Sequence, residues 1–183
     1  ASGKLTGADK IASSPVALGV RADTARDLGW TDAAPTWSDI AAAAGDGDLT
    51  FAMTDPGTSN SGFSALVSVA TALADTGNAL TVADIDRVAP QLSELFGGQT
   101  VTSGSSGWLA DTFRDDPSRA DALVNYESVL HALATDGLDI EVIVPADGVV
   151  SADYPLSALA EPADLLARDR VAALAEWLYA NPD

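Results

Sequence analysis

Two short loops rich in glycine and serine carry the residues of this sequence that are best suited to bind a ligand. The first loop is Gly57–Gly62 and the second is Ser103–Gly107, and each precedes a segment with helical spacing of apolar residues. The first turn of a helix leaves backbone N–H groups unpaired, and the helix dipole favours negative charge there. Each loop therefore predicts either a binding site for a polar ligand or a helix that is capped by its own side chains.

The presence of two such loops in one chain favours the binding role. In open α/β sheets, ligands bind beside the carboxyl ends of the strands, where helix N-termini gather. Because the loops present hydrogen-bond donors and few cations lie nearby, the predicted ligand is a small oxyanion, a carboxylate or another polar solute. A neutral sugar or a peptide is the alternative. The candidate ligand-binding residues of the two loops are Ser59, Asn60, Ser61, Gly62, Ser103, Gly104, Ser105 and Ser106.

Other chemistries fit these residues less well. The first loop has the glycine spacing of a phosphate-binding P-loop, but Phe63 stands where that loop needs a lysine. The second loop is one residue too short for the G-x-S-x-G nucleophile elbow. A serine hydrolase would have to use His131, the only histidine, which falls inside a predicted helix. The sequence has no metal-ligand pattern, including the D-x-S-x-S of von Willebrand factor type A domains, so no catalytic residue, metal or cofactor is predicted.

The composition narrows the range of partners. Nine Lys and Arg residues against 27 Asp and Glu residues give a net charge of −18 at pH 7. Such a charge repels a phosphate backbone, so nucleic-acid binding is not expected. The chain has no cysteine, which excludes disulfide bonds and thiolate nucleophiles. Its apolar stretches are far shorter than the roughly 20 residues that a membrane-spanning helix needs.

Strands and helices are predicted to alternate along the chain. Buried or extended strands are predicted at 14–20, 49–54, 122–126, 139–145 and 152–156. Helices are predicted at 22–28, 36–45, 63–75, 81–96, 108–113, 127–134 and 163–179. This alternation indicates the α/β class, with a three-layer αβα arrangement and a mostly parallel sheet. We expect Ser14–Val20 and Asp139–Pro145 to be neighbouring strands, and the last helix to pack on the chain through Trp177 and Leu178.

Several segments, in this order, resemble the type II periplasmic solute-binding proteins, particularly the bacterial extracellular group with molybdate-binding relatives. Ile11–Val20 resembles the strand that crosses from the first lobe into the second, and Phe51–Gly62 resembles the family's strand, Asp-Pro turn and helix start. Asn125–Ser128 resembles a Tyr-Glu-Ser segment of the family, and Val144–Leu156 resembles the return crossing. The resemblance implies one lobe over residues 1–143, with residues 144–183 returning to an incomplete other lobe. It also implies that Tyr126 and Tyr154 line the ligand cleft.

The function that the resemblance implies is a non-catalytic binding module that works outside the cytoplasm. Its expected partners are a small-molecule ligand and either a membrane permease or a fused adhesion-type domain, since relatives of this kind are found fused to von Willebrand factor type A domains. One rival hypothesis is a structural or interaction domain of a cell-surface protein that has kept the fold without ligand binding. The other is a hydrolase that uses His131.

Overall fold

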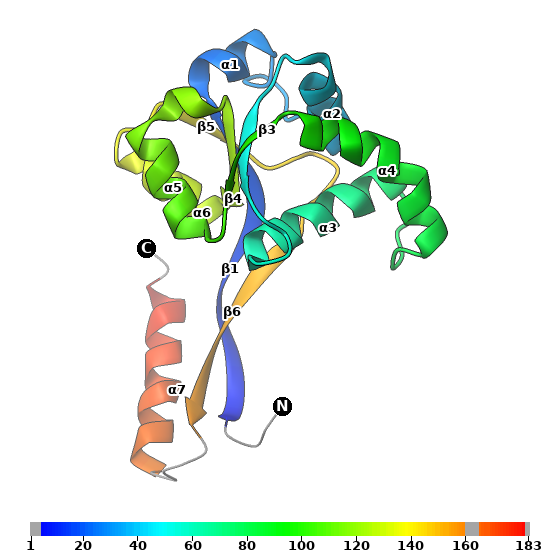
Figure 1. Cartoon of the computed structure of the whole chain (residues 1–183). Coiled ribbons are helices and arrows are strands. Elements are labelled where there is room, and N and C mark those ends of the chain that lie inside the picture. The colour runs from blue at the N-terminus through cyan, green and yellow to red at the C-terminus, as the bar shows by residue number, and fades with distance from the viewer. Residues whose placement is uncertain (1–4, 160–164, 182–183) are drawn as a thin grey trace. The chain divides into compact units, whose positions relative to one another are not determined.

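The structure is a computed structural model that describes residues 5–159 and 165–181 of the chain (Figure 1). The chain divides into two compact units. The larger unit is Pro15–Ser151, and the smaller unit combines Ala1–Ser14 with Ala152–Asp183. Both predicted loops belong to the larger unit, which therefore carries most of the candidate site.

The larger unit is built from short strands and helices that alternate along the chain. Strand β1 (Leu5–Arg21) opens the described chain and continues into this unit. The elements that follow are α1 (Ala22–Asp27), α2 (Trp37–Asp46), β2 (Phe51–Thr54), α3 (Asn60–Ala74), α4 (Val82–Gly97), β3 (Gln99–Ser103), α5 (Ser106–Asp115), a 3₁₀ turn (Pro117–Arg119), β4 (Ala122–Tyr126), α6 (Glu127–Thr135) and β5 (Ile140–Ile143). Strand β6 (Ser151–Leu159) and helix α7 (Leu165–Ala180) complete the described chain.

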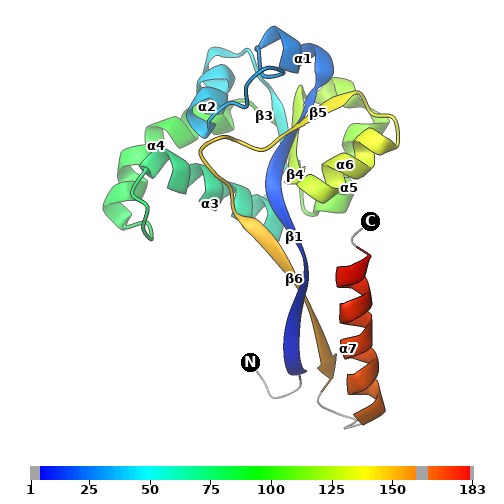
Figure 2. The ribbon, with the colours of Figure 1, turned by 180° about the vertical axis from the view of Figure 1, so that it is seen from behind.

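The sheet is mixed, so the prediction of a mostly parallel sheet is wrong. Its strands run in the order β3-β2-β4-β1-β5. Strand β2 pairs in parallel with β3 and β4, whereas β1 is antiparallel to both β4 and β5. The alternation of strands and helices indicates crossover connections, but it does not determine the direction in which β1 enters the sheet. The prediction that Ser14–Val20 and Asp139–Pro145 are neighbouring strands is confirmed, because β1 and β5 pair in the sheet (Figure 2). Leu18 lies opposite Ile143 in this ladder.

Alternate residues of each strand face two hydrophobic cores on opposite sides of the sheet. On β4, Ala122 and Val124 belong to one core and Leu123 belongs to the other. This period of two is the pattern expected of a strand that is covered on both faces. Helices α2, α3 and α4 cover the first face, and α5 and α6 cover the second (Figure 1). The larger unit is therefore a layered α/β lobe, as predicted.

Helices α2 and α4 begin with capping boxes, in which a carboxylate of the chain occupies the helix N-terminus. In α2, the Thr36 hydroxyl accepts the N–H of Asp39 at 3.2 Å, and the Asp39 carboxylate accepts the N–H of Thr36 at 2.8 Å. Thr81 and Asp84 repeat this exchange in α4. The backbone and hydroxyl donors of Thr36 lower the pKa of Asp39 below its ordinary value. Both helices thus carry their own anion near neutral pH.

In the smaller unit, strand β6 pairs with β1 and helix α7 follows. The prediction that the last helix packs through Trp177 and Leu178 is half wrong, because Leu178 is half-buried but Trp177 is 59% exposed. Helix α7 buries Ala175 instead, at 4% exposure. Leu178 lies one turn from Ala175 on the same side of the helix, whereas Trp177 follows Ala175 by two positions and points to the opposite side.

Candidate functional site

The two predicted loops meet at one edge of the sheet. Since β2, β3 and β4 are parallel, their carboxyl ends lie at the same edge, and α3, α5 and α6 follow them in the chain. Thr54 at the end of β2 lies opposite Ser103 at the end of β3. The N–H of Asp55 also donates to the carbonyl of Ser103 at 2.8 Å, which joins the two loops directly.

Helix α3 begins without a side-chain cap. Ser59 is the N-cap residue, but its hydroxyl bonds to the Ser61 hydroxyl at 3.1 Å and accepts no backbone N–H. Ser61 is 4% exposed, and its hydroxyl also bonds to Oγ1 of Thr54 at 2.9 Å. Among the described residues, no hydrogen bond uses the backbone N–H of Asn60, Ser61 or Gly62. The first turn of α3 therefore leaves three backbone N–H groups unpaired within the described chain.

Helix α5 offers two further donors beside them. Its N-cap Ser105 accepts the N–H of Trp108 at 3.3 Å. Ser103 is buried, and its hydroxyl donates to the carbonyl of Ser105 at 2.9 Å. The hydroxyl groups of Ser103 and Ser61 thus form hydrogen bonds inside the protein that hold the two loops in place. Within the described part of the chain, the N–H groups of Ser106 and Gly107 have no acceptor.

The two glycines of the predicted site have different surroundings. Gly62 is buried, and a Cβ there would lie 2.8 Å from Oγ1 of Thr54 and even closer to the Thr54 carbonyl oxygen. Glycine at this position lets the start of α3 lie directly against the end of β2. Gly104 is exposed, and a Cβ there would have no heavy atom within 4 Å. A side chain at Gly104 can therefore be introduced without a clash.

The first turns of α3 and α5 contain no acidic residue, although the chain has 27 Asp and Glu residues. Helices α2, α4 and α6 each place an acidic residue there, namely Asp39, Asp84 and Glu127. A carboxylate in the first turn compensates the positive end of the helix dipole. Helices α3 and α5 leave that positive end uncompensated, so they form the part of this edge that best suits an anion.

Tyr126 connects the end of β4 with the first loop. The side-chain amide of Asn60 donates to the Tyr126 hydroxyl at 2.7 Å, and Tyr126 is half-buried. No hydrogen bond among the described residues uses the Tyr126 hydroxyl as a donor. Because a phenol both donates and accepts, this O–H can reach a ligand while it accepts from Asn60. Tyr154, the remaining predicted residue, lies on β6 in the smaller unit and is 42% exposed.

Asn125 is a buried polar residue beside the loops that is not among the predicted site residues. It is 0% exposed, its amide nitrogen donates to the carbonyl of Ser106 at 3.0 Å, and its amide oxygen accepts the N–H of Tyr126 at 2.8 Å. The signal in the sequence is an amide that directly follows the apolar run Ala122–Val124 and directly precedes the candidate ligand residue Tyr126.

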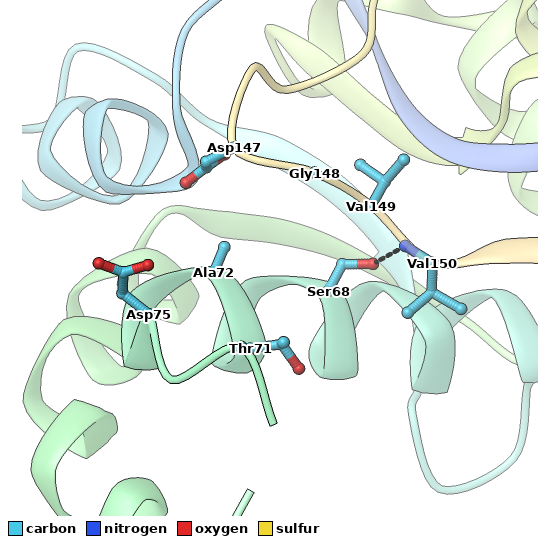
Figure 3. A pocket seen from close by; sticks show the side chains of 9 residues that line it. Ser68, Thr71, Ala72, Asp75, Asp147, Gly148, Val149 and Val150 are labelled. Atoms are coloured by element: carbon cyan, nitrogen blue, oxygen red, sulfur yellow. Dashed lines mark hydrogen bonds between the residues drawn. The ribbon is translucent and has the colours of Figure 1, made fainter. Parts of the chain in front are cut away.

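A cavity of about 350 Å³ lies between the C-terminal half of α3 and residues 147–150 (Figure 3). The Ser68 hydroxyl on its wall accepts the N–H of Val150 at 2.8 Å. The carboxylates of Asp75 and Asp147 border the cavity, which disfavours an anion there. No predicted site residue lines it. The lining residues are Ser68, Thr71, Ala72, Asp75, Gly77, Asp147, Gly148, Val149 and Val150.

His131 has the surroundings of a surface residue. Its side chain is 63% exposed, and its Nε2 lies 3.7 Å from Oε1 of Glu127 one turn earlier in α6. The described residues contain no group of three or more His, Asp or Glu side chains that could hold a metal ion. In the same part of the chain, no helix is both long and apolar enough to cross a membrane.

Three solved structures with this fold are binding proteins. The sulfate-binding protein SubI from Mycobacterium tuberculosis H37Rv has a TM-score of 0.65 and 20% identity, with 91% of this chain and 51% of that chain covered. The periplasmic binding protein AfuA from Actinobacillus pleuropneumoniae, with fructose-6-phosphate bound, has a TM-score of 0.62 and 15% identity, with 92% and 48% covered. A periplasmic thiamin binding protein has a TM-score of 0.63 and 12% identity, with 92% and 48% covered.

This chain spans about half the length of these proteins, so it corresponds to half of a type II periplasmic binding protein. No curated protein matches the sequence. Residues 1–181 match the family model described as bacterial extracellular solute-binding protein. That family is extracellular or periplasmic and non-catalytic, so the hypothesis of a hydrolase that uses His131 is rejected. The chain belongs to the family of bacterial extracellular solute-binding proteins.

Proposed function

We propose that this lobe binds a small solute with an oxyanion group, of the sulfate or phosphate class, at the first turns of α3 and α5. The observation that carries the proposal is the meeting of these two helix N-termini at one sheet edge, with unpaired N–H groups and no acidic residue in either first turn. The three N–H groups of α3 and the two of α5 would face the ligand from two directions. Tyr126 would add an O–H donor that Asn60 orients.

Neutral donors are sufficient for such a ligand. An exposed helix N-terminus stabilises a nearby anion by only about 0.3–1 kcal/mol, so affinity has to come from several hydrogen bonds in a desolvated cleft. Hydrogen bonds to an ionised acceptor are stronger than those between neutral groups. The net charge of −18 opposes anion binding, but salt screens charges farther than about 8 Å under physiological conditions. The local donors therefore dominate.

The relatives support the oxyanion class, since one is sulfate-binding and another holds fructose-6-phosphate. The thiamin binding protein has the same fold, so the fold alone does not determine the ligand. The proposed ligand class therefore rests on the two loops of this chain. Because this chain spans about half of each relative, a second lobe is expected to complete the cleft. We further propose that the protein works outside the cytoplasm and delivers its solute to a membrane permease.

A charge introduced at Gly104 tests the proposal. Gly104→Asp places a carboxylate beside the start of α5 without a clash, because nothing lies within 4 Å of the new Cβ. Two like charges a few ångströms apart repel strongly near a protein surface, so the affinity for an oxyanion should fall by about tenfold or more. Gly104→Asn has nearly the same shape and no charge, and it should stay within about threefold of the parent.

The measurement is titration calorimetry on the full-length protein with sulfate, inorganic phosphate and fructose 6-phosphate in turn. Binding of at least one of them, with the predicted difference between the two variants, would support the proposal. If none of the three binds, or if Gly104→Asp and Gly104→Asn bind equally well, the proposed site is wrong.

A further inference from the structure

Asn125 occupies a place in the core where apolar residues would be expected. It lies on the central part of the sheet, where β4 pairs with β1 and Asn125 lies opposite Ala17. The preceding residues of β4, Leu123 and Val124, are buried apolar side chains of the two cores. Burial of an amide costs free energy unless its donor and acceptor are both used. Asn125 is 0% exposed and uses both, so its position is strongly determined.

The two partners of Asn125 belong to the two sides of the candidate site. Its amide nitrogen holds the carbonyl of Ser106, the first residue of α5, and its amide oxygen holds the N–H of Tyr126. The hydroxyl of Tyr126 in turn accepts the side-chain amide of Asn60, the first residue of α3. Three hydrogen bonds and the side chain of Tyr126 thus link the start of α5 to the start of α3.

We propose that Asn125 is a positioning residue that fixes the first turns of α3 and α5 in one geometry for the ligand. The inference rests on the proposed function in so far as the groups it positions bind an oxyanion. Asparagine is the residue that this position requires, because an aspartate lacks the donor for Ser106 and a leucine lacks both groups. Fixing the donors before the ligand arrives reduces the ordering cost of binding. Asn125 therefore affects affinity without touching the ligand.

The first test needs no ligand. The N–H groups of Trp108 and Leu109 both donate to Ser105 at the start of α5. In Asn125→Asp, the loss of the bond to Ser106 should speed hydrogen exchange at these two N–H groups by about tenfold, measured by NMR. Asn125→Thr, which suits a strand, should give the same result if the aspartate variant does not fold. The control is Ser68→Ala, which also removes a buried polar group. The Ser68 hydroxyl donates to the carbonyl of Ser64 and accepts the N–H of Val150, away from both loops. The control should leave these two N–H groups unchanged.

The second test is a double-mutant cycle on affinity with Asn125→Thr and Tyr126→Phe, using whichever of sulfate, inorganic phosphate or fructose 6-phosphate binds the parent protein. Each single variant should weaken binding by about tenfold, and the double variant should weaken it by clearly less than the product, because both break the same series of bonds. Ser68→Ala should bind like the parent.

The outcomes separate this inference from the proposed function. Unchanged exchange at Trp108 and Leu109 in a folded Asn125 variant would overturn the positioning role, whatever binds. Additive losses of affinity, or losses within about threefold, would also overturn it. Failure of all three ligands to bind the parent protein would count against the proposed function, and the exchange experiment would still decide whether Asn125 couples the loops.

Discussion

Replacement of Gly62 by alanine is expected to destabilise the protein by about 1–3 kcal/mol. In an unobstructed helix the same change is stabilising by roughly 0.5–1 kcal/mol, because alanine loses less conformational entropy than glycine. At Gly62 the new methyl group would meet the hydroxyl of Thr54 at 2.8 Å and come closer still to its carbonyl oxygen, so α3 would have to move away from β2. The free energy of unfolding from urea denaturation measures the effect.

Gly107→Ala is the matched control for Gly62→Ala. Gly107 also lies in the first turn of a helix, but a Cβ there has no heavy atom within 4 Å. This variant should therefore be as stable as the parent or more stable by up to about 1 kcal/mol. The two glycine substitutions should thus have opposite signs. Equal effects at Gly62 and Gly107 would show that α3 does not lie against the end of β2 as closely as described.

The second large effect is expected at Trp37, whose replacement by alanine should cost about 3–5 kcal/mol of stability. Trp37 is 1% exposed in the core beneath α2, so alanine would leave a cavity. Its indole N–H donates to the carbonyl of Gly148 at 3.0 Å, and its backbone N–H donates to Asp147 at 3.0 Å. Within the larger unit, Trp37 therefore anchors the connection between β5 and β6 to the start of α2.

Trp37→Phe separates the two contributions at this position. Phenylalanine fills most of the space but cannot donate to Gly148, so a loss of about 1–3 kcal/mol is expected from the missing hydrogen bond together with the smaller ring. Denaturation of both variants should show this order, with alanine the less stable. A Trp37→Ala protein within about 1 kcal/mol of the parent would mean that this side chain is not the anchor.

Much of the fold could be predicted from local patterns. The apolar spacing in Phe63–Asp75 and Thr81–Phe96 identified α3 and α4 to within a few residues, because helix signals are local. Strand β3 was missed, because Gln99–Ser103 lies at the sheet edge and exposes Thr100 and Thr102. The direction of β1 was also not predictable, since it depends on pairing with β4 and β5 far along the chain.

The location of the candidate site could be predicted from the sequence, but most of its side-chain contacts could not. Helix N-termini with small residues after parallel strands are a sequence-level feature, and the two loops do meet at one edge. Which side chain faces outward is decided by packing, so Ser61 and Ser103 turn out to be buried and hydrogen-bonded inside the protein. Asn125 was missed for the same reason, since its role comes from partners that only the folded chain brings near.

The most direct test of the proposed site is an NMR titration of the backbone N–H signals of the full-length protein with sulfate, inorganic phosphate and fructose 6-phosphate. The account predicts that the largest shifts occur at Asn60–Gly62 and at Ser106 and Gly107, with the signals of Ser68 and Val150 at the cavity wall unchanged. Shifts centred on the cavity, or no shift at the starts of α3 and α5 with any of the three ligands, would contradict it.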